Sequence, residues 1–218
     1  MFKWITEFIR AVRSYDERAS ITNEFDGYGF MKRVYGIESM PRFETLAKLA
    51  RTDVLTKAYN RMAFDDFMVK EVAAARRYKA PLGLIALNID DFRTIARQHS
   101  YLICDEVIVE VANILRHRMR TSDLLFRWVG HMFVMLLPHT NMDGTKIAAD
   151  KYRQDVSEHN FPEIGRITCS FGVIEFEEGD TEDLIIKRAE AALAEAKKEG
   201  GNHVVTLHKA AHDTPQPV

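Results

Sequence analysis

The stretch DLLFRWVGHMFVMLLP, residues 123–138, contains two apolar runs separated by a glycine-containing dipeptide. Apolar runs of this length on either side of a turn signal predict two β-strands, so we expect a hairpin with Val129-Gly130 at its tip. Phe126 and Trp128 in the first run fit a packed core better than a base-stacking platform. The turn that follows them is either an active-site turn or one that has lost its chemistry.

Outward from the hairpin, helical and strand-like patterns alternate along the chain. Expected helices cover about residues 60–78, 105–118, 142–159 and 181–199. Further expected strands are residues 81–89, 166–176 and 203–208. Helices must bury their apolar faces on a sheet, so this order predicts an α+β fold with a central, mostly antiparallel five-stranded sheet flanked by helices.

The first 52 residues differ in pattern from the rest and are expected to form an N-terminal helical extension. Residues 1–14 have amphipathic helical spacing, residues 15–38 suit a linker, and a second helix is expected from Ser39 to the domain boundary near Asp53. The first helix could pack on its own domain or on a second copy of the chain; we do not expect it to contact a membrane surface. Residues 209–218 are expected to be a disordered tail.

Composition excludes several function classes. Hydrophobic residues make up 46% of the 218 residues, and the net charge is −2, which gives no general attraction for nucleic acid. The two cysteines, Cys104 and Cys169, stand in apolar surroundings and lack metal-binding spacing. No apolar stretch is long enough to span a membrane. These features predict a cytoplasmic protein that does not bind nucleic acid.

Five segments resemble, in order, the motifs of GGDEF domains, the diguanylate cyclase family. They are DVLTKAYNRMAF (53–64), LNIDDFRTI (87–95), CDEVIVEVANILR (104–116), SFGVIEF (170–176) and AEAALAEAKKEGGNHVV (189–205). The resemblance covers residues 53–208 and implies the nucleotidyl cyclase-like fold of that family. Active members bind one GTP per domain, and two facing domains produce cyclic di-GMP.

This resemblance makes two departures in the metal site important. Attack of a 3′-hydroxyl on an α-phosphate needs metal ions, which carboxylates must hold. The family has these carboxylates at the positions of Asn88 and His131. An amide lacks the negative charge, and an imidazole is a poor partner for Mg²⁺. The sequence therefore predicts no metal cofactor and no cyclase activity.

The signature turn departs further from the family pattern. It reads VGHMF in place of GGDEF or GGEEF. Val129 replaces a glycine that lets the backbone approach the phosphates, and Met132 replaces a glutamate. Gly130 and Phe133 are retained. The turn thus resembles a degenerate catalytic turn.

The other nucleotide contacts implied by the resemblance are mixed. Asp105 matches the base-binding aspartate, whereas Ala96 replaces its asparagine partner. Arg93 stands where lysine is usual, Lys197 is retained, and Gly201 replaces an arginine. Weak GTP binding therefore remains an open alternative.

The RTSD stretch, Arg120 to Asp123, lies five residues before the signature turn. In the family, an R-x-x-D at this spacing is the inhibitory site for cyclic di-GMP. A guanidinium can pair with guanine O6 and N7 or with a phosphate, and a carboxylate accepts from guanine N–H groups. Lys151 or Arg153 would supply a second basic contact. The alternative is an ordinary Arg/Asp pair, or a vestigial site.

Two function hypotheses follow. In the first, a catalytically inactive GGDEF-like domain receives cyclic di-GMP and signals to a protein partner, through residues 1–52 or as a homodimer. In the second, the domain is a scaffold that binds no nucleotide. Residual cyclase activity is a third alternative. The resemblance suggests a bacterial signalling role in surface attachment or motility.

Overall fold

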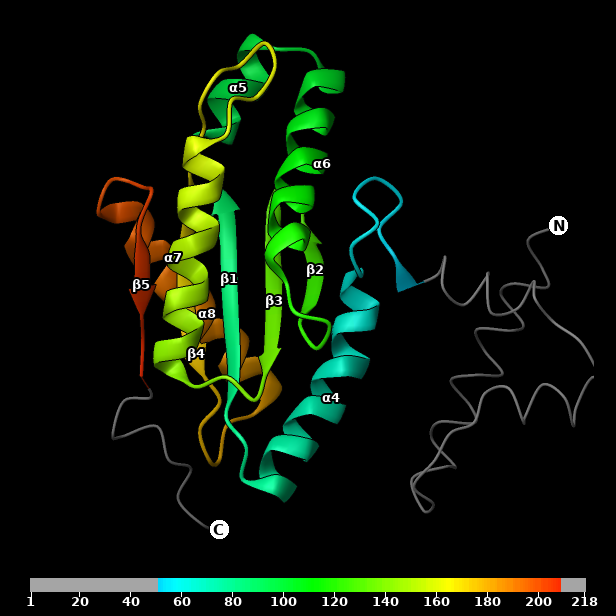
Figure 1. The fold of residues 1–218 in the computed structure, drawn as a ribbon, viewed down its shortest axis with the longest axis vertical. Coiled ribbons are helices and arrows are strands. Elements are labelled where there is room, and N and C mark those ends of the chain that lie inside the picture. Colours follow the sequence, from blue (N-terminus) through cyan, green and yellow to red (C-terminus); the bar gives the residue numbers. More distant parts are fainter. Residues whose placement is uncertain (1–50, 209–218) are drawn as a thin grey trace, which may run out of the picture. The chain divides into compact units, whose positions relative to one another are not determined.

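The computed structural model describes residues 51–208, which form one alternating series of helices and strands (Figure 1). The helices are α4 (Arg61–Tyr78), α5 (Phe92–Gln98), α6 (Tyr101–Arg118), α7 (Met142–Glu158) and α8 (Glu182–Lys198). The strands are β1 (Leu82–Ile89), β2 (Leu124–Val129), β3 (Met132–Pro138), β4 (Cys169–Glu175) and β5 (Val204–Thr206). The predicted helical extension and the predicted tail lie outside the described residues, except for the last residues of the extension.

The strands form one sheet in the order β2-β3-β1-β4-β5. β1 pairs antiparallel with β3 on one side and with β4 on the other, so that Leu84 lies opposite Leu136 and Ile174. Only the pair of β4 and β5 is parallel. The predicted five-stranded, mostly antiparallel sheet is confirmed.

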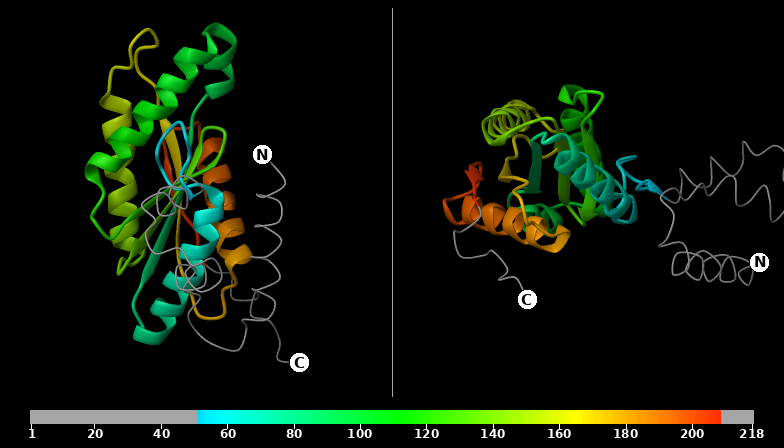
Figure 2. Two further views of the ribbon diagram at one scale, coloured as in Figure 1. Left: turned by 90° about the vertical axis from the view of Figure 1, so that its right-hand side faces the viewer. Right: turned by 90° about the horizontal axis from the view of Figure 1, so that it is seen from below.

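Helices cover both faces of this sheet. Leu84 and Ala86 of β1 belong to a core cluster with α4 and α8, whereas Ile85 and Leu87 belong to a second cluster with α6 and α7. Figures 1 and 2 show the resulting three layers, with the sheet between the two helix pairs. Since successive strand side chains point to opposite faces, a central strand between two helical layers is apolar almost throughout.

Three local features differ from the expectations. Helix α5 was not among the predicted elements, and α6 starts at Tyr101, earlier than expected, where the Ser100 side chain accepts a hydrogen bond from the Ile103 N–H. Strand β2 extends to Val129, so the hairpin loop consists of Gly130 and His131 rather than Val129-Gly130. Gly130 has φ +56°, a conformation that favours glycine.

The aromatic residues before the hairpin turn have a structural role. Phe126 is fully buried, and its ring packs against Phe64 with ring centroids 5.1 Å apart. Trp128 also packs edge-on against Phe64, and the Arg61 guanidinium lies 4.4 Å from its ring centroid. Neither ring is a free stacking platform. Cys104 and Cys169 are buried free thiols, as expected.

Among the described residues, no helix is both long and apolar enough to cross a membrane.

Candidate functional site

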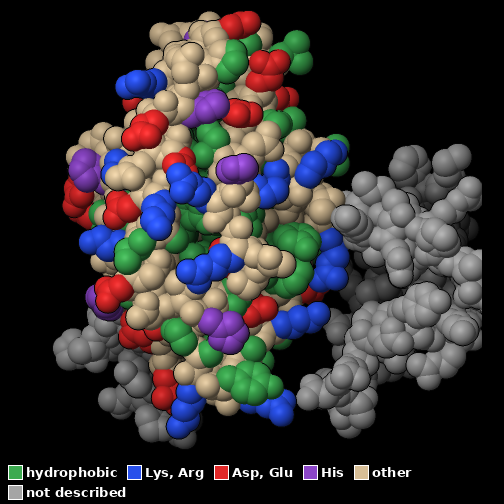
Figure 3. Space-filling view, viewed as in Figure 1, with side chains coloured by type: hydrophobic (Ala, Val, Ile, Leu, Met, Phe, Trp, Pro, Cys, Tyr) green, Lys and Arg blue, Asp and Glu red, His purple; other side chains and the backbone are tan. Residues whose placement is uncertain are grey.

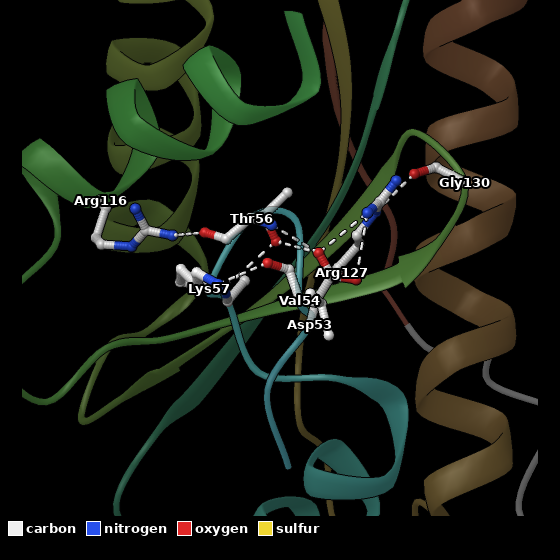
Figure 4. Close-up of polar contacts among 8 residues, drawn as sticks. Asp53, Val54, Thr56, Lys57, Arg116, Arg127 and Gly130 are labelled. Carbon is white, nitrogen blue, oxygen red and sulfur yellow. Dashed lines mark hydrogen bonds and ion pairs between the residues drawn. The ribbon is translucent and has the colours of Figure 1, made fainter. Parts of the chain in front are cut away.

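The hairpin turn is tied to the first loop of the domain by Arg127 of β2. Its guanidinium donates to the Gly130 carbonyl at 2.9 Å and to both carboxylate oxygens of Asp53, at 3.0 and 3.2 Å. The Asp53 carboxylate also accepts from the backbone N–H and the hydroxyl of Thr56, at 2.8 and 2.7 Å (Figure 4). One arginine therefore positions the turn relative to a loop 74 residues earlier in the chain.

These contacts give Asp53 a pKa below its ordinary value of 3.8. Burial raises the pKa of this carboxyl, but the two hydrogen bonds from Thr56 and the contact with Arg127 together lower it by more. The ionised form of Asp53 is therefore the one that the folded protein stabilises.

This lowered pKa predicts a pH-dependent contribution to stability. An aspartate with a depressed folded pKa stabilises the fold above its unfolded pKa, and this contribution is lost as the pH falls through its folded value. We expect Asp53→Asn to cost roughly 1 kcal/mol near pH 7, a modest value because the pair is partly exposed. Urea unfolding of both proteins at a series of pH values should show this difference shrinking below about pH 4. A difference that persists unchanged at pH 3 would contradict the assignment.

A pocket of about 510 Å³ lies beside the turn, at the carboxyl end of β1. The strand end supplies Asn88, the start of α5 supplies Phe92 and Arg93, and α8 supplies Lys197. His131 of the hairpin loop also lines this pocket. The structure thus brings together four of the predicted active-site positions: Asn88, Arg93, His131 and Lys197.

His131 is half-buried. Its imidazole stacks on the Phe92 ring, with centroids 4.4 Å apart and planes 16° from parallel. Burial lowers the pKa of His131, and the positive charges of Lys197 and Arg93 lower it further. The pocket around this histidine is therefore electropositive and favours the neutral imidazole.

Asp90 also lines the pocket. Its carboxylate is hydrogen-bonded to the start of β4, to the residue before β4 and to the loop before β5. It accepts hydrogen bonds from the Thr168 and Ser170 hydroxyls, each at 2.7 Å, and from the Asn202 N–H at 2.8 Å. Gly201 packs directly on it, because a Cβ there would lie 3.1 Å from the Asp90 carboxyl carbon. Both oxygens of Asp90 are thereby committed to internal contacts.

The residues at this pocket do not fit the Mg²⁺ ion that the resemblance implies. The two positions that would carry metal-binding carboxylates hold an amide, Asn88, and an imidazole, His131, whose surroundings are positively charged. Mg²⁺ prefers oxygen ligands and negative charge. Within residues 51–208, no group of three or more His, Cys, Asp or Glu side chains could hold a metal ion.

A second pocket, of about 250 Å³, lies at the end of α6 and the start of α7. It brings together Arg120, Asp123 and Lys151, three of the residues predicted to bind cyclic di-GMP. Asp123 is 8% exposed and accepts from the Arg120 N–H at 2.8 Å, which closes the turn before β2. Figure 3 views the α6 and α7 face and shows Lys and Arg side chains over it, with Asp and Glu side chains among them.

Two further polar residues that line this second pocket are held by their surroundings. Tyr152 lines it, and burial, followed by the negative charge of Asp123, raises its pKa to about 12. Arg118 also lines the pocket, and its guanidinium donates to both carboxylate oxygens of Asp155, at 2.6 and 2.8 Å. This ion pair joins the end of α6 to α7.

The remaining predicted residues lie elsewhere. Arg153 contacts Asp150 and the Asn202 side chain, and it is not among the residues that line the second pocket. Asp105 is exposed on α6 and lines a third, largely apolar pocket of about 650 Å³, whereas Ala96 lies on α5. Of the other turn residues, Val129 is exposed, and Met132 and Phe133 are buried.

Sequence reasoning missed several residues that shape these pockets. Asp53 and Arg127 are far apart in sequence, so no local pattern predicts their ion pair. Phe92 and Tyr152 occupy positions that look like ordinary core positions.

A mostly antiparallel five-stranded sheet between two helical layers, with a basic pocket beside the turn of its β2–β3 hairpin, is typical of a nucleotidyl cyclase-like domain. A family model described as "Diguanylate cyclase, GGDEF domain" matches residues 50–203. The chain belongs to the GGDEF-domain family.

Known proteins agree with this assignment. The chain is 32% identical over 194 residues to diguanylate cyclase DgcP of Pseudomonas aeruginosa, covering 84% of this chain and 29% of DgcP. It is 32% identical to diguanylate cyclase VdcA of Vibrio cholerae, covering 75% of this chain and 50% of VdcA. The chain thus spans at most half the length of these two curated relatives.

A solved structure of the GGDEF domain of DgcB from Caulobacter crescentus, in complex with c-di-GMP, has the same fold. It matches with a TM-score of 0.69 and 29% identity, covering 72% of this chain and 93% of that domain. Diguanylate cyclase SiaD of Pseudomonas aeruginosa, solved in complex with its activator SiaC, matches with a TM-score of 0.71 and 25% identity, covering 94% of this chain and 76% of SiaD.

Proposed function

We propose that this chain is a catalytically inactive GGDEF domain that acts as a cyclic di-GMP receptor. The observation that carries the proposal is the pocket between α6 and α7, which joins Arg120, Asp123 and Lys151. Through this site the domain would signal to a protein partner, with residues 1–52 as the connecting segment.

The chemistry of this pocket suits a guanine nucleotide with phosphodiester groups. Arg120 is exposed, so its guanidinium can reach the Hoogsteen edge of a guanine or a phosphate. Asp123 can accept from the guanine N1–H and amino groups, and Lys151 adds a second positive charge. The GGDEF domain of DgcB, solved in complex with c-di-GMP, supports a ligand of this class for a chain of the same family.

The absence of cyclase activity follows from the chemistry of the first pocket. Phosphoryl transfer depends on charge neutralisation and positioning by metal ions. With Asn88 and His131 at the metal positions, the pocket lacks both carboxylates that would hold such ions. Incubation with GTP and either Mg²⁺ or Mn²⁺ should therefore give no cyclic di-GMP above a buffer control. Turnover at a steady rate would contradict this part of the proposal.

The receptor role is tested by calorimetric titration of cyclic di-GMP into the full chain. We expect micromolar binding by the wild type, and at least about tenfold weaker binding by Arg120→Ala, since a hydrogen bond to a charged group contributes about 1.5–3 kcal/mol. Arg120 supplies only backbone atoms to the turn with Asp123, so the variant should retain its fold.

Arg166→Ala is the matched control, because Arg166 is also an exposed arginine and lines none of the pockets described above. It should bind like the wild type. A wild type that binds no cyclic di-GMP, with an unchanged melting temperature, would overturn the receptor role and favour the nucleotide-independent scaffold. Equal weakening by both substitutions would mean that binding reflects general charge only.

A further inference from the structure

We propose that Asp155 weakens the binding of cyclic di-GMP in the pocket between α6 and α7, because it holds Arg118 of that pocket in an internal ion pair. The inference rests on the proposed receptor role and adds a residue that regulates the same site. Neither Arg118 nor Asp155 belongs to the R-x-x-D motif. The observation that carries the inference is the position of their ion pair at the edge of the pocket.

Arg118 is shared between two neighbouring pockets. It lines the pocket of about 250 Å³ that contains Arg120 and Lys151, and it also lines a further pocket of about 430 Å³. Asp155 lines only the larger of the two. The guanidinium of Arg118 is thus bound to an acceptor that lies outside the proposed ligand site.

Arg118 differs in this respect from the other two cations of the pocket between α6 and α7. Arg120 and Lys151 are both exposed, and within residues 51–208 neither of them forms an ion pair. Arg118, by contrast, donates from Nε to one carboxylate oxygen of Asp155 at 2.6 Å and from Nη2 to the other at 2.8 Å. Two of the three cations are therefore available to a ligand, whereas Asp155 neutralises the third.

A phosphate group competes directly with Asp155 for this guanidinium. Arginine binds carboxylates and phosphates with the same pair of parallel N–H donors, so Nε and Nη2 of Arg118 cannot fully serve both at once. Cyclic di-GMP, with its two phosphodiester groups, must either displace Asp155 or bind without the third cation. Both routes give weaker binding than a pocket in which Arg118 is unpaired.

The ion pair can open without disturbing the packing of the two helices. The Arg118 side chain is 55% exposed and that of Asp155 is 22% exposed, and pairs with this much solvent contact contribute little to stability. The packing of α6 and α7 depends instead on fully buried residues such as Leu115 and Val156, which belong to one core cluster. The isosteric substitution Asp155→Asn should therefore retain the fold.

Calorimetric titration of cyclic di-GMP into the full chain tests this role of Asp155. We expect Asp155→Asn to bind about fivefold more tightly than the wild type, because the amide leaves the Arg118 charge unpaired. General damage to the site cannot produce such a gain of affinity. Asp150→Asn is the matched control, since it removes the same charge from the same helix, but Asp150 contacts Arg153 and lines neither pocket. It should bind like the wild type.

A second substitution shows whether Asp155 acts through Arg118. In the Arg118→Gln background, Asp155→Asn should give at most about a twofold gain, since no guanidinium remains to be released. A gain equal to that in the wild-type background would mean that Asp155 repels the ligand directly, and it would overturn the role of Arg118. Equal gains from Asp155→Asn and Asp150→Asn would also overturn it, because they would reflect general charge only.

The ion pair itself is tested without any ligand. The Nε–H resonance of Arg118, identified by its absence in Arg118→Gln, should shift between the wild type and Asp155→Asn in heteronuclear NMR spectra. An unchanged resonance, or binding by the wild type that Asp155→Asn does not tighten, would overturn this inference and leave the receptor role standing. No binding of cyclic di-GMP by either protein, despite the expected shift, would overturn the receptor role and this inference with it.

Discussion

Replacing Gly172 with alanine is expected to lower the free energy of unfolding by about 3 kcal/mol, because the contact between β4 and α8 has no room for the added methyl group. Gly172 lies on β4 beneath α8. A Cβ at this position would lie 2.3 Å from both the Ala189 carbonyl oxygen and the Leu193 nitrogen, which are backbone atoms of α8. Since helix backbone cannot rotate aside as a side chain can, the helix and the strand must separate. Urea unfolding monitored by circular dichroism measures the loss.

Gly165→Ala is the control for this substitution. Gly165 has φ +84°, and a Cβ there would meet no heavy atom within 4 Å. This variant therefore has only the backbone strain of a left-handed residue, about 1–2 kcal/mol. If Gly172→Ala destabilised the protein no more than Gly165→Ala does, this result would contradict the close packing of α8 on β4 at Gly172.

The second large effect is expected at the buried ion pair that joins α8 to the loop after β4. The Asp180 side chain is fully buried, and it accepts from the Arg188 guanidinium at 2.5 Å and from the Glu177 N–H at 2.8 Å. Arg188 also donates to the Glu175 carbonyl and to the Glu177 carboxylate. Asp180→Ala leaves the Arg188 charge buried without its main partner, so we expect a loss of about 3–5 kcal/mol.

A double-mutant cycle isolates this interaction from general damage to the loop. Arg188→Met alone should also be strongly destabilising, since it leaves the Asp180 carboxylate buried without the guanidinium. The double variant Asp180→Ala, Arg188→Met should lose clearly less than the sum of the single losses, because it contains neither uncompensated charge. Additive losses would mean that the two residues act independently.

Much of the fold could be predicted from sequence because its signals are local. The unbroken apolar run of β1 indicates a strand covered on both faces, and helical spacing identified α4, α7 and α8 close to their observed bounds. Helix α5 was missed because seven residues carry too few turns for a clear periodic pattern. The start of α6 was misplaced because Tyr101 and Leu102 are exposed apolar residues that disturb the amphipathic pattern.

The candidate sites were predictable only where a motif carried the information. Motif register identified Arg120, Asp123 and Lys151, which the structure then brings to one pocket. The same register could not separate Lys151 from Arg153, because neighbouring residues of a helix face different ways and the direction depends on tertiary packing. The stacking of His131 on Phe92 also depends on tertiary structure, since the two residues come from different elements.

The contacts of Arg127 also limit how the first loop and the hairpin tip can separate. One guanidinium joins the carboxylate of Asp53, close to where the described domain begins, to the carbonyl of Gly130 at the tip of the hairpin. Separating the loop from the tip would break the hydrogen bonds on at least one side of this guanidinium. These bonds do not depend on any catalytic chemistry at the turn.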